Sequence, residues 1–373
     1  MKKLDNKGWK KVRFGEVCRN LNVTVKSPEQ NGYDKVIGLE NIESGSLHIK
    51  TWGVLADGTT FTKTFEPGHV LFGKRRAYLK KAAFAEFKGL CSGDILVFEA
   101  ITKVLHPKLL PFIVSSDRFF DYAVKTSAGS LSPRTKFQDL ANFEFSLPPI
   151  DQQEKLAELL WAGDEFTKHL LSISKKLDQI IKNRLFEISE TKEKDIKQVK
   201  CINEVVIILD NKRKPLNEKQ RFEMKGDIPY YGANGVVDYI NDFLFDEALI
   251  LIAEDGGSFH EYQTKPIAYK ISGKSWVNNH AHVLKPSNNL SIDWLFYSLV
   301  HKDIRNFIIG STRTKLNKSE LMKIKIWMPP NDIQTKLVSE INTLVTNFHN
   351  CTSQANEVTV LTRNLINSIF NGI

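Results

Sequence analysis

The chain has 373 residues, of which 42% are hydrophobic and 25% are charged, as is typical of a folded globular protein. Its 23 Phe, 9 Tyr and 6 Trp residues exclude a disordered chain, and no apolar run approaches the ~18–20 residues of a membrane span. The net charge of +9 is spread over both halves, which favours a nucleic-acid partner.

The compartment follows from the cysteines and from the first residues. The four cysteines lie far apart in the sequence, which favours a reducing environment over a disulfide framework. The N-terminal residues contain no apolar segment of a signal peptide. We therefore expect a cytoplasmic protein with no membrane partner.

In chain order, the first half begins with short strands and turns, for example the apolar run Val36–Leu39. Alternating apolar residues over 143–147 then predict a strand, which ends at Pro148-Pro149 because proline cannot continue a hydrogen-bonded ladder. Asp151 occupies the expected position of a helix N-cap. A long helix is predicted to follow over residues 151–188.

The second half repeats this order. An apolar strand is expected at Ala248–Ala253, and a second alternating strand at 324–328 ends at Pro329-Pro330. Asp332 is the expected N-cap of a second long helix over 332–370. The two prolines Pro148 and Pro329 lie 181 residues apart, about half the chain, and an Arg-Thr-Lys triplet precedes both strands. The sequence thus consists of two copies of one unit.

Each long helix carries a narrow stripe with the 3–4 spacing of a coiled coil. In the first helix the stripe is Leu156, Leu159, Gly163, Phe166, Leu170, Ile173, Leu177, Ile180 and Arg184. In the second helix it is Leu337, Ile341, Leu344, Phe348, Cys351, Ala355, Val358, Thr362 and Leu365. Each stripe needs a partner, and two copies related by a pseudo-two-fold axis would pair their helices antiparallel.

Together these patterns predict an α+β fold with a pseudo-two-fold internal repeat, in which two long antiparallel coiled-coil helices separate two similar globular domains. The expected bounds are 1–150 for the first domain, 151–190 for the central helix, 191–331 for the second domain and 332–373 for the C-terminal helix. Two domains with distributed positive charge suit a protein that reads two places on one long ligand.

No catalytic motif is complete. The stretch Ser272–Ser275 lacks the earlier glycine of a phosphate-binding loop, and the Pro-Pro segments lack the flanking residues of an amino-methyltransferase loop. The acidic stretch Glu254–Gly257 lacks a nuclease spacing and is typical of a tight turn. His280 and His282 alternate on a predicted strand without a third ligand at zinc-like spacing, which favours a solvated or hydrogen-bonded pair over a metal site. We expect neither a catalytic residue nor a metal site.

Several segments resemble the specificity (S) subunits of type I restriction-modification enzymes. They are Trp9–Val17, Ile228–Gly235, Leu249–Gly256, Gly310–Leu316 and the two Pro-Pro helix segments. The resemblance spans nearly the whole chain, although Glu254 stands where an arginine is common and the first half departs more from the family's pattern.

This resemblance implies two target-recognition domains, each of which reads one half of a split double-stranded DNA sequence. The long helices would set the spacing between the domains and dock two methyltransferase subunits, and a motor-nuclease restriction subunit would join for cleavage. The chain itself would hold no cofactor, because S-adenosylmethionine would be bound by the partner methyltransferase.

DNA readers use Arg and Lys on phosphates and guanine, and Asn on adenine. In the first domain the candidate contacts are Lys74, Arg75, Arg76, Tyr78, Lys80, Arg134 and Lys136. In the second domain they are Lys212, Arg213, Tyr231, Asn234, Asp255, Gly256, His260, Asn278, Asn279, Arg313 and Lys315.

Alternatives remain open for these residues and for the function. Arg134/Lys136 and Arg313/Lys315 recur at the same point of each copy, which suits phosphate contacts or a repeated structural ion pair. Tyr231, in a Gly-rich turn, could instead be a core residue. At the level of function, the alternatives are a self-contained DNA-modifying enzyme with an unrecognised motif, and a protein scaffold that does not bind DNA.

Overall fold

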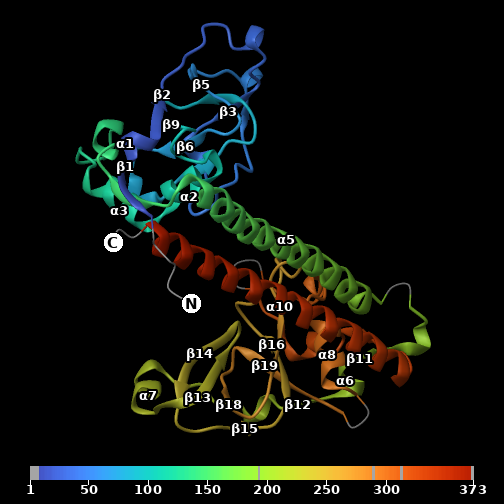
Figure 1. The fold of residues 1–373 in the computed structure, drawn as a ribbon. Coiled ribbons are helices and arrows are strands. Elements are labelled where there is room, and N and C mark those ends of the chain that lie inside the picture. The colour runs from blue at the N-terminus through green and yellow to red at the C-terminus, as the bar shows by residue number, and fades with distance from the viewer. Residues whose placement is uncertain (1–7, 192–193, 288–289, 311–313, 371–373) are drawn as a thin grey trace. The chain divides into compact units, whose positions relative to one another are not determined.

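The computed structural model describes residues 8–191, 194–287, 290–310 and 314–370. The chain divides into two compact units: unit 1 comprises Met1–Leu171 with Ser353–Ile373, and unit 2 comprises Ser172–Thr352. Each unit therefore contains one set of short strands and one segment of each long helix (Figure 1). In the described part of the chain, no helix combines the length and the apolar character that crossing a membrane requires.

Unit 1 contains ten strands among its described residues. They are β1 (Lys10–Arg13), β2 (Cys18–Leu21), β3 (Lys35–Ile37), β4 (Gly53–Val54), β5 (Lys63–Phe65), β6 (Val70–Gly73), β7 (Ala82–Phe84), β8 (Gly89–Cys91), β9 (Ile95–Ala100) and β10 (Glu144–Leu147). One sheet has the antiparallel order β2-β9-β6-β7, and a second has the order β4-β3-β8-β5 with β3 and β8 parallel. Strands β1 and β10 form a separate antiparallel pair.

Unit 2 repeats this topology strand for strand. Its strands are β11 (Val199–Cys201), β12 (Val206–Ile208), β13 (Lys225–Gly232), β14 (Gly235–Ile240), β15 (Phe245–Asp246), β16 (Leu249–Ala253), β17 (Ala268–Ile271), β18 (Lys274–Val277), β19 (Ala281–Pro286) and β20 (Lys325–Trp327). The sheets have the orders β12-β19-β16-β17, β14-β13-β18-β15 and β11-β20, and β13 and β18 are parallel. Each strand of unit 1 thus has its counterpart ten numbers higher, which confirms the duplication.

Short helices complete both units. The α-helices are α1 (Phe14–Val17), α2 (Leu110–Ser115), α3 (Asp117–Lys125), α4 (Phe137–Leu140), α6 (Ile202–Val205), α7 (Glu218–Glu223), α8 (Ile292–Leu299) and α9 (Lys318–Leu321). The 3-10 turns are η1 (Glu29–Asn31), η2 (Leu39–Asn41), η3 (Leu55–Asp57), η4 (Ala77–Leu79), η5 (Pro107–Leu109), η6 (Ile196–Gln198), η7 (Asp210–Lys212) and η8 (Arg305–Phe307). The strands and helices together confirm the α+β class.

The two long helices are α5 (Ile150–Ser189) and α10 (Asn331–Phe370). The prediction that Asp151 and Asp332 are N-caps is wrong, because each helix begins one residue earlier. The first helical hydrogen bonds are accepted by the second prolines: Gln153 N donates to Pro149 O and Gln334 N to Pro330 O. The two aspartates lie instead in the first turn, where a carboxylate interacts favourably with the helix dipole.

Two buried glutamines hold the starts of these helices. The Gln153 side chain donates to the carbonyls of Pro148 (2.9 Å) and Val104 (3.0 Å) and accepts from His106 N (2.8 Å). Gln334 donates in the same way to the carbonyl of Pro329 (2.8 Å). The glutamine that recurs four residues after the second proline of each pair therefore fixes the turn from strand into helix.

Within each unit the two helix segments contact each other. In unit 2 the Ser174 hydroxyl lies 2.9 Å from the Thr352 hydroxyl, and Arg184 Nε donates to Glu340 (2.9 Å). The residue number rises along one helix as it falls along the other, so the segments are antiparallel, as predicted. In unit 1 a Cβ atom on Gly163 would lie 2.7 Å from Thr362 Oγ1, so the helices approach closely at this glycine.

The predicted stripe on α5 is only half right. Leu159, Phe166, Ile173 and Ile180 are exposed by 59, 51, 46 and 45%. The contact face uses the residue after each of them, namely Leu160, Thr167, Ser174 and Ile181, which are buried or half-buried. On α10 every residue of the predicted stripe is buried or half-buried. Hydrophobicity misplaces the α5 stripe because two of the positions that form the contact are the polar residues Thr167 and Ser174.

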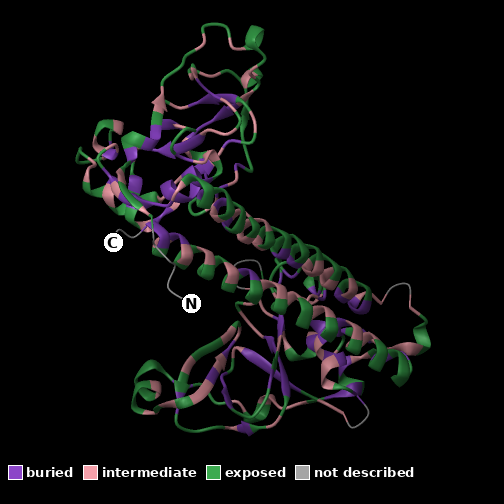
Figure 2. Ribbon diagram, viewed as in Figure 1, coloured by how far each residue is buried: buried purple, intermediate pink, exposed green. Residues whose placement is uncertain are grey.

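The core of each unit lies between its sheets and helices (Figure 2). In unit 1 it is rich in phenylalanine: the ring of Phe72 stacks on Phe98 at 5.7 Å and meets Phe119 edge-on at 5.5 Å. Ile366, Ile369 and Phe370 at the end of α10 belong to the same cluster. The end of α10 is thus an integral part of the unit 1 core, which also contains Val70 and Phe72 of β6 and so supports the loop that follows this strand.

Candidate nucleic-acid interface

The densest basic stretch of unit 1 is the loop between β6 and β7. Arg76 (φ 54°) and Lys80 (φ 50°) both adopt the left-handed backbone conformation, on either side of η4. Ala77 is buried, whereas Arg76 and Tyr78 are exposed. A left-handed conformation is unfavourable for these residue types, so the surrounding contacts must hold the loop in place.

A second loop, residues 126–135, supplies those contacts. Arg76 N donates to Pro133 O (2.8 Å), and Thr135 N donates to Lys74 O (3.1 Å). Arg75 pairs with Arg134 in an isolated β-bridge, and its guanidinium also donates to Ser132 Oγ (3.2 Å). Two segments about sixty residues apart thereby form one polar surface, which brings together Lys74, Arg75, Arg76 and Arg134.

Asp94, which sequence reasoning missed, lies between two arginines of this surface. It accepts from Arg134 Nε and Nη2 at 2.8 and 3.2 Å, and Arg75 Nη1 lies 3.6 Å away. The hydrogen bond from Arg134 lowers the pKa of the Asp94 carboxyl, so it stays ionised. Arg134 is therefore an ion-paired but exposed arginine, and Lys136 lies exposed two residues further on.

Lys80 belongs to a structural network of unit 1. Its ammonium group donates to Asp117 Oδ1 (2.7 Å), and the same carboxylate accepts from Arg363 (2.8 and 2.9 Å) and Asn367 (2.7 Å) of α10. The hydrogen bond from Arg363 is the main cause that holds the pKa of Asp117 far below its usual range. The ion pair between Lys80 and Asp117 thus fixes the basic loop to the start of α3.

Unit 2 places different chemistry at the same positions. Lys315 forms β-bridges with Asp255 and Ile309, just as Arg134 does with Arg75 and Ala128. Leu316 N donates to Glu254 O (2.7 Å), as Thr135 N does to Lys74 O. Glu254 and Asp255 therefore stand where unit 1 has Lys74 and Arg75.

These bridges also correct the alignment of the repeat. Arg134 corresponds to Lys315 and not to Arg313, so the two Arg-Thr-Lys triplets are out of register by two residues. The offset of 181 residues between Arg134 and Lys315 is the same as that between Pro148 and Pro329. Arg313 itself lies outside the described residues.

Unit 2 contains a buried network of charged side chains, formed by Asp210, Arg213, Glu254 and His282. His282, only 1% exposed, has Nδ1 2.6 Å from Asp210 Oδ2 and Nε2 2.7 Å from the Leu316 carbonyl. Because a carbonyl oxygen only accepts, Nε2 carries a hydrogen. Arg213 donates to Glu254 (2.7 Å) and to the Ala281 carbonyl (2.8 Å).

The ionisation of the two carboxylates follows from these contacts. Burial is the largest single influence on Asp210 and disfavours its charged form, but the hydrogen bonds with His282 and Val283 N and the attraction of Arg213 together outweigh burial and lower the pKa. Burial acts in the same way on Glu254 and is outweighed by Arg213 and Lys315. Asp210, Glu254 and His282 lie close enough together to ligate a metal, yet the Arg213 guanidinium already supplies the positive charge. We interpret the cluster as structural.

A pocket of about 360 Å³ in unit 2 gathers several candidate DNA contacts. Its lining includes Asp255, Gly256, Asn278, Asn279 and His280. The His280 ring lies 2.6 Å from Asp255 Oδ1, and His280 N donates to Asn278 Oδ1 (2.8 Å). At its rim, the Asn234 amide donates to the Gly256 carbonyl (2.9 Å). The pocket therefore combines amide groups and a carboxylate, which can read base edges.

The remaining candidates of unit 2 are dispersed. Tyr231 lies in strand β13 and not in a turn, and its neighbour Tyr230 is a core residue whose hydroxyl bonds the Leu216 backbone. Lys212 and His260 are exposed and do not line the pocket. Contacts such as Arg134–Asp94 and Arg213–Glu254 span about forty residues, and no local signal in the sequence indicates them.

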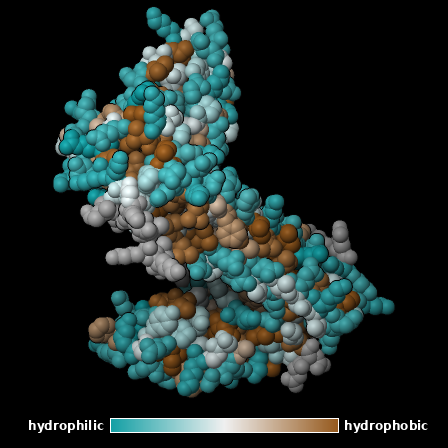
Figure 3. All heavy atoms as spheres, viewed as in Figure 1, coloured by the Kyte–Doolittle hydropathy of each residue, from teal (hydrophilic) through white to brown (hydrophobic). Residues whose placement is uncertain are grey.

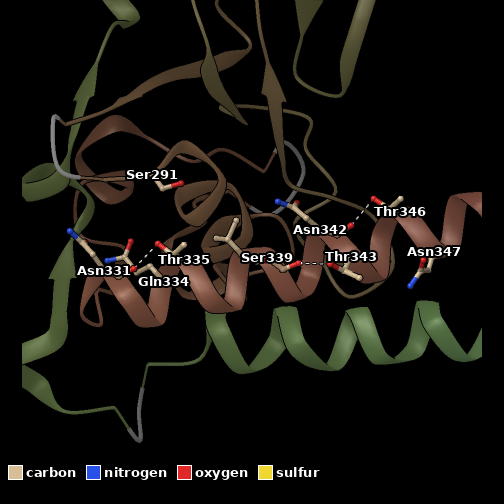
Figure 4. A pocket seen from close by; sticks show the side chains of 10 residues that line it. Ser291, Asn331, Gln334, Thr335, Ser339, Asn342, Thr343, Thr346 and Asn347 are labelled. Atoms are coloured by element: carbon tan, nitrogen blue, oxygen red, sulfur yellow. Dashed lines mark hydrogen bonds between the residues drawn. The ribbon is translucent and has the colours of Figure 1, made fainter.

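A larger hollow of about 660 Å³ lies along the first half of α10 in unit 2 (Figure 4). Its lining consists of Ser291 and of residues of α10. Apart from Val338, these are Asn, Gln, Thr and Ser residues. All three threonines of the lining, Thr335, Thr343 and Thr346, donate their hydroxyls to the helix backbone four residues earlier. The lining contains no carboxylate, imidazole or thiol, so it does not form a constellation for acid–base or thiol chemistry.

The chain thus consists of two copies of one α+β unit, each with a polar loop surface of its own. The sequence profile described as "Type I restriction modification DNA specificity domain" matches residues 6–183 and 193–359. The chain belongs to this family and contains its domain twice.

Individual relatives agree with this assignment. The chain is 37% identical over 145 residues to a protein of Haemophilus influenzae named as a type I restriction enzyme specificity subunit, S.HindORF215P; the match covers 39% of this chain and 36% of that one. The chain spans about a third of the length of the first curated relatives it matches.

Solved structures share the fold. The type I restriction-modification S subunit from M. genitalium superposes with a TM-score of 0.65 at 16% identity, over 100% of this chain and 98% of that one. The HsdS subunit from Thermoanaerobacter tengcongensis superposes with a TM-score of 0.51 at 19% identity, over 98% and 97%.

Proposed function

We propose that the chain is the DNA-recognition subunit of a type I restriction-modification complex and that it reads a bipartite double-stranded DNA sequence. One observation carries this proposal: the same scaffold, used twice, presents different side chains at the same place. Lys74 and Arg75 of unit 1 are replaced by Glu254 and Asp255 in unit 2. Two copies of one fold with different readers are what two different half-sites require.

Each unit would combine contacts that position the DNA with contacts that read it. In unit 1 the exposed Arg76 and Lys136 suit phosphates, and Lys74 and Arg75 suit guanine edges. In unit 2 the pocket that contains Asn278 and Asn279 suits adenine, and Asp255 suits the amino group of cytosine or adenine. Lys212 remains free to contact a phosphate, whereas Arg213 serves the buried network.

The exposed half of the predicted α5 stripe supports a docking role for this helix. Leu159 and Phe166 in unit 1, and Ile173 and Ile180 in unit 2, recur every seven residues and are about half exposed. Apolar side chains also reach the surface along the long helices in Figure 3. An exposed apolar heptad is typical of a helix that packs against a partner, and we assign it to two methyltransferase subunits.

In this proposal the chain is not itself an enzyme. The methyltransferase partners would bind S-adenosylmethionine and transfer the methyl group, and a motor-nuclease subunit would cleave DNA. The polar lining of the 660 Å³ hollow and the internally satisfied His282 network support this division, since neither offers a free acid, base or nucleophile of a catalytic pair.

The experiment is to mix the purified chain with S-adenosylmethionine and plasmid DNA, with and without the methyltransferase. Methylation at a split sequence only when both proteins are present is the expected result. Methylation by the chain alone would instead indicate a self-contained modifying enzyme. If the complete mixture fails to bind DNA even at low salt, where phosphate contacts are strongest, the chain is a protein scaffold.

A further inference from the structure

Three large apolar side chains reach solvent on the two loops of unit 1 that we propose as DNA contacts, the loop between β6 and β7 and the loop 126–135. Tyr78 is 54% exposed, Leu79 is 40% exposed and Leu131 is 90% exposed. A single exposed leucine is ordinary in a folded protein. These three, however, belong to two loops joined by the hydrogen bonds from Arg76 N to Pro133 O (2.8 Å) and from Arg75 to Ser132 Oγ (3.2 Å).

We call Tyr78, Leu79 and Leu131 the apolar tip. Backbone hydrogen bonds fix the conformation of the loop that carries Tyr78 and Leu79. Leu79 N donates to Arg76 O and Lys80 N to Ala77 O, both at 2.9 Å, which closes the turn η4. Over the described ranges, Arg76 and Lys80 are the non-glycine residues with positive φ. The burial of Ala77 and the Lys80–Asp117 ion pair hold these conformations. Such strain persists only where the surrounding structure enforces it, so the contacts of the loop hold Tyr78 and Leu79 in their exposed positions.

The positive charges of Arg76, Lys74 and Arg134 around the apolar tip indicate the kind of ligand that it binds. Arg76 is exposed and its guanidinium has no hydrogen-bond partner among the described residues, while Lys74 and Arg134 flank it. Apolar side chains surrounded by cations fit a ligand with an anionic outside and an apolar inside. Duplex DNA has both, because its phosphates lie outside its base stack.

We propose that Tyr78, Leu79 and Leu131 form an apolar wedge that enters one base step of the half-site read by unit 1 and partly unstacks it, while Arg76 neutralises an adjacent phosphate. This inference rests on the proposed DNA-recognition function. Insertion of apolar side chains between base steps is a known way to kink a duplex, and its energetic cost depends on the step, so the wedge contributes to sequence choice.

The test uses the chain with its methyltransferase and a duplex that contains the methylated sequence, with 2-aminopurine placed in turn at positions of each half-site. Bound wild-type protein should raise the 2-aminopurine fluorescence at one step of one half-site. Replacing all three wedge residues by alanine should abolish that rise and weaken binding about 10-fold, the size expected for the loss of one stacking contact. The slope of affinity against salt should not change, because no phosphate contact is removed.

Two controls make the outcomes distinct. Val54→Ala, on the exposed strand β4, should leave both fluorescence and affinity unchanged. Arg76→Ala should lower the slope of affinity against salt by about 1.

Sequence-specific binding by wild type without any fluorescence rise, or a full rise with the triple variant, would refute the wedge alone. Loss of methyltransferase association in the triple variant would make the tip a protein contact, and absence of DNA binding by wild type would refute the proposed function as well.

Discussion

At the scale of single residues, Arg213 differs from its neighbour Lys212 although both are basic candidates by sequence. Arg213 is turned into unit 2, where it contacts Glu254 and the Ala281 carbonyl. We expect Arg213→Ala to lower the free energy of unfolding by about 2–3 kcal/mol, because it removes the closest partner of the largely buried Glu254 carboxylate and leaves Lys315 at 3.0 Å and His282 at 3.7 Å. Urea unfolding followed by tryptophan fluorescence measures this.

Lys212→Ala is the matched control for that measurement. Its side chain is exposed, so the change should stay within about 0.5 kcal/mol. Equal effects of the two substitutions would contradict the assignment of Arg213 to a structural network.

His48 gives unit 1 a pH-dependent contribution to stability. Its Nε2 lies 2.6 Å from Asp164 of α5 and its Nδ1 3.2 Å from Glu86. The hydrogen bond with Asp164 raises the pKa of His48, although burial and the nearby Lys168 oppose the shift. A raised folded-state pKa means that the stabilisation is complete below the unfolded value of about 6.5 and disappears as the pH rises through the folded value.

The difference in unfolding free energy between wild type and His48→Gln should therefore be larger at about pH 5.5 than at about pH 8.5. Unfolding both proteins in urea at the two pH values gives this difference directly. A difference that grows towards alkaline pH would contradict the ion pair.

At the scale of elements, Gln153 shows how a side chain sets the start of a helix. Its replacement by alanine leaves the Pro148 and Val104 carbonyls and the His106 amide without their partner, and each unpaired buried group costs about 1–3 kcal/mol. We expect Gln153→Ala to lower the free energy of unfolding by at least ~2 kcal/mol. Gln152→Ala, one residue earlier and exposed, should have almost no effect in the same assay.

The exposed heptad of α5 makes a separate prediction. Phe166→Ser removes a half-exposed ring from the surface assigned to the methyltransferase and should weaken that association while DNA contacts of the loops persist. Analytical size-exclusion chromatography of the mixed proteins reports the complex. Lys168→Ser, exposed on the same helix, serves as the control, and an intact complex with Phe166→Ser would exclude this face as the docking site.

Much of the element order was predictable because its signals are local: Pro-Pro ends each strand, and the apolar spacing predicts both long helices. Two predictions failed where tertiary contacts decide. Pro149, and not Asp151, accepts the first helical bond, because the buried Gln153 draws the helix start against the Pro148 carbonyl. The α5 stripe is misplaced because Thr167 and Ser174, polar residues, occupy the contact face.

The candidate site was predictable in outline and less so in detail. The basic loop after β6 is evident from its sequence, yet the pairing of Arg134 with Asp94 depends on two loops that the chain brings together. The Arg-Thr-Lys triplets suggested an equivalence that the β-bridges correct by two residues. Identical amino acids in the two copies are a weaker guide to the alignment of the repeat than the position of each residue in the repeated fold.

At the scale of the whole molecule, the central claim is that each unit is an independent reader. The most direct measurement is methylation profiling of cells that express the methyltransferase with this chain, or with a chimera in which residues 1–150 come from a relative. The account predicts a split recognition sequence for both proteins, with one half unchanged and the other half replaced. A change in both halves, or a continuous sequence without a spacer, would contradict it.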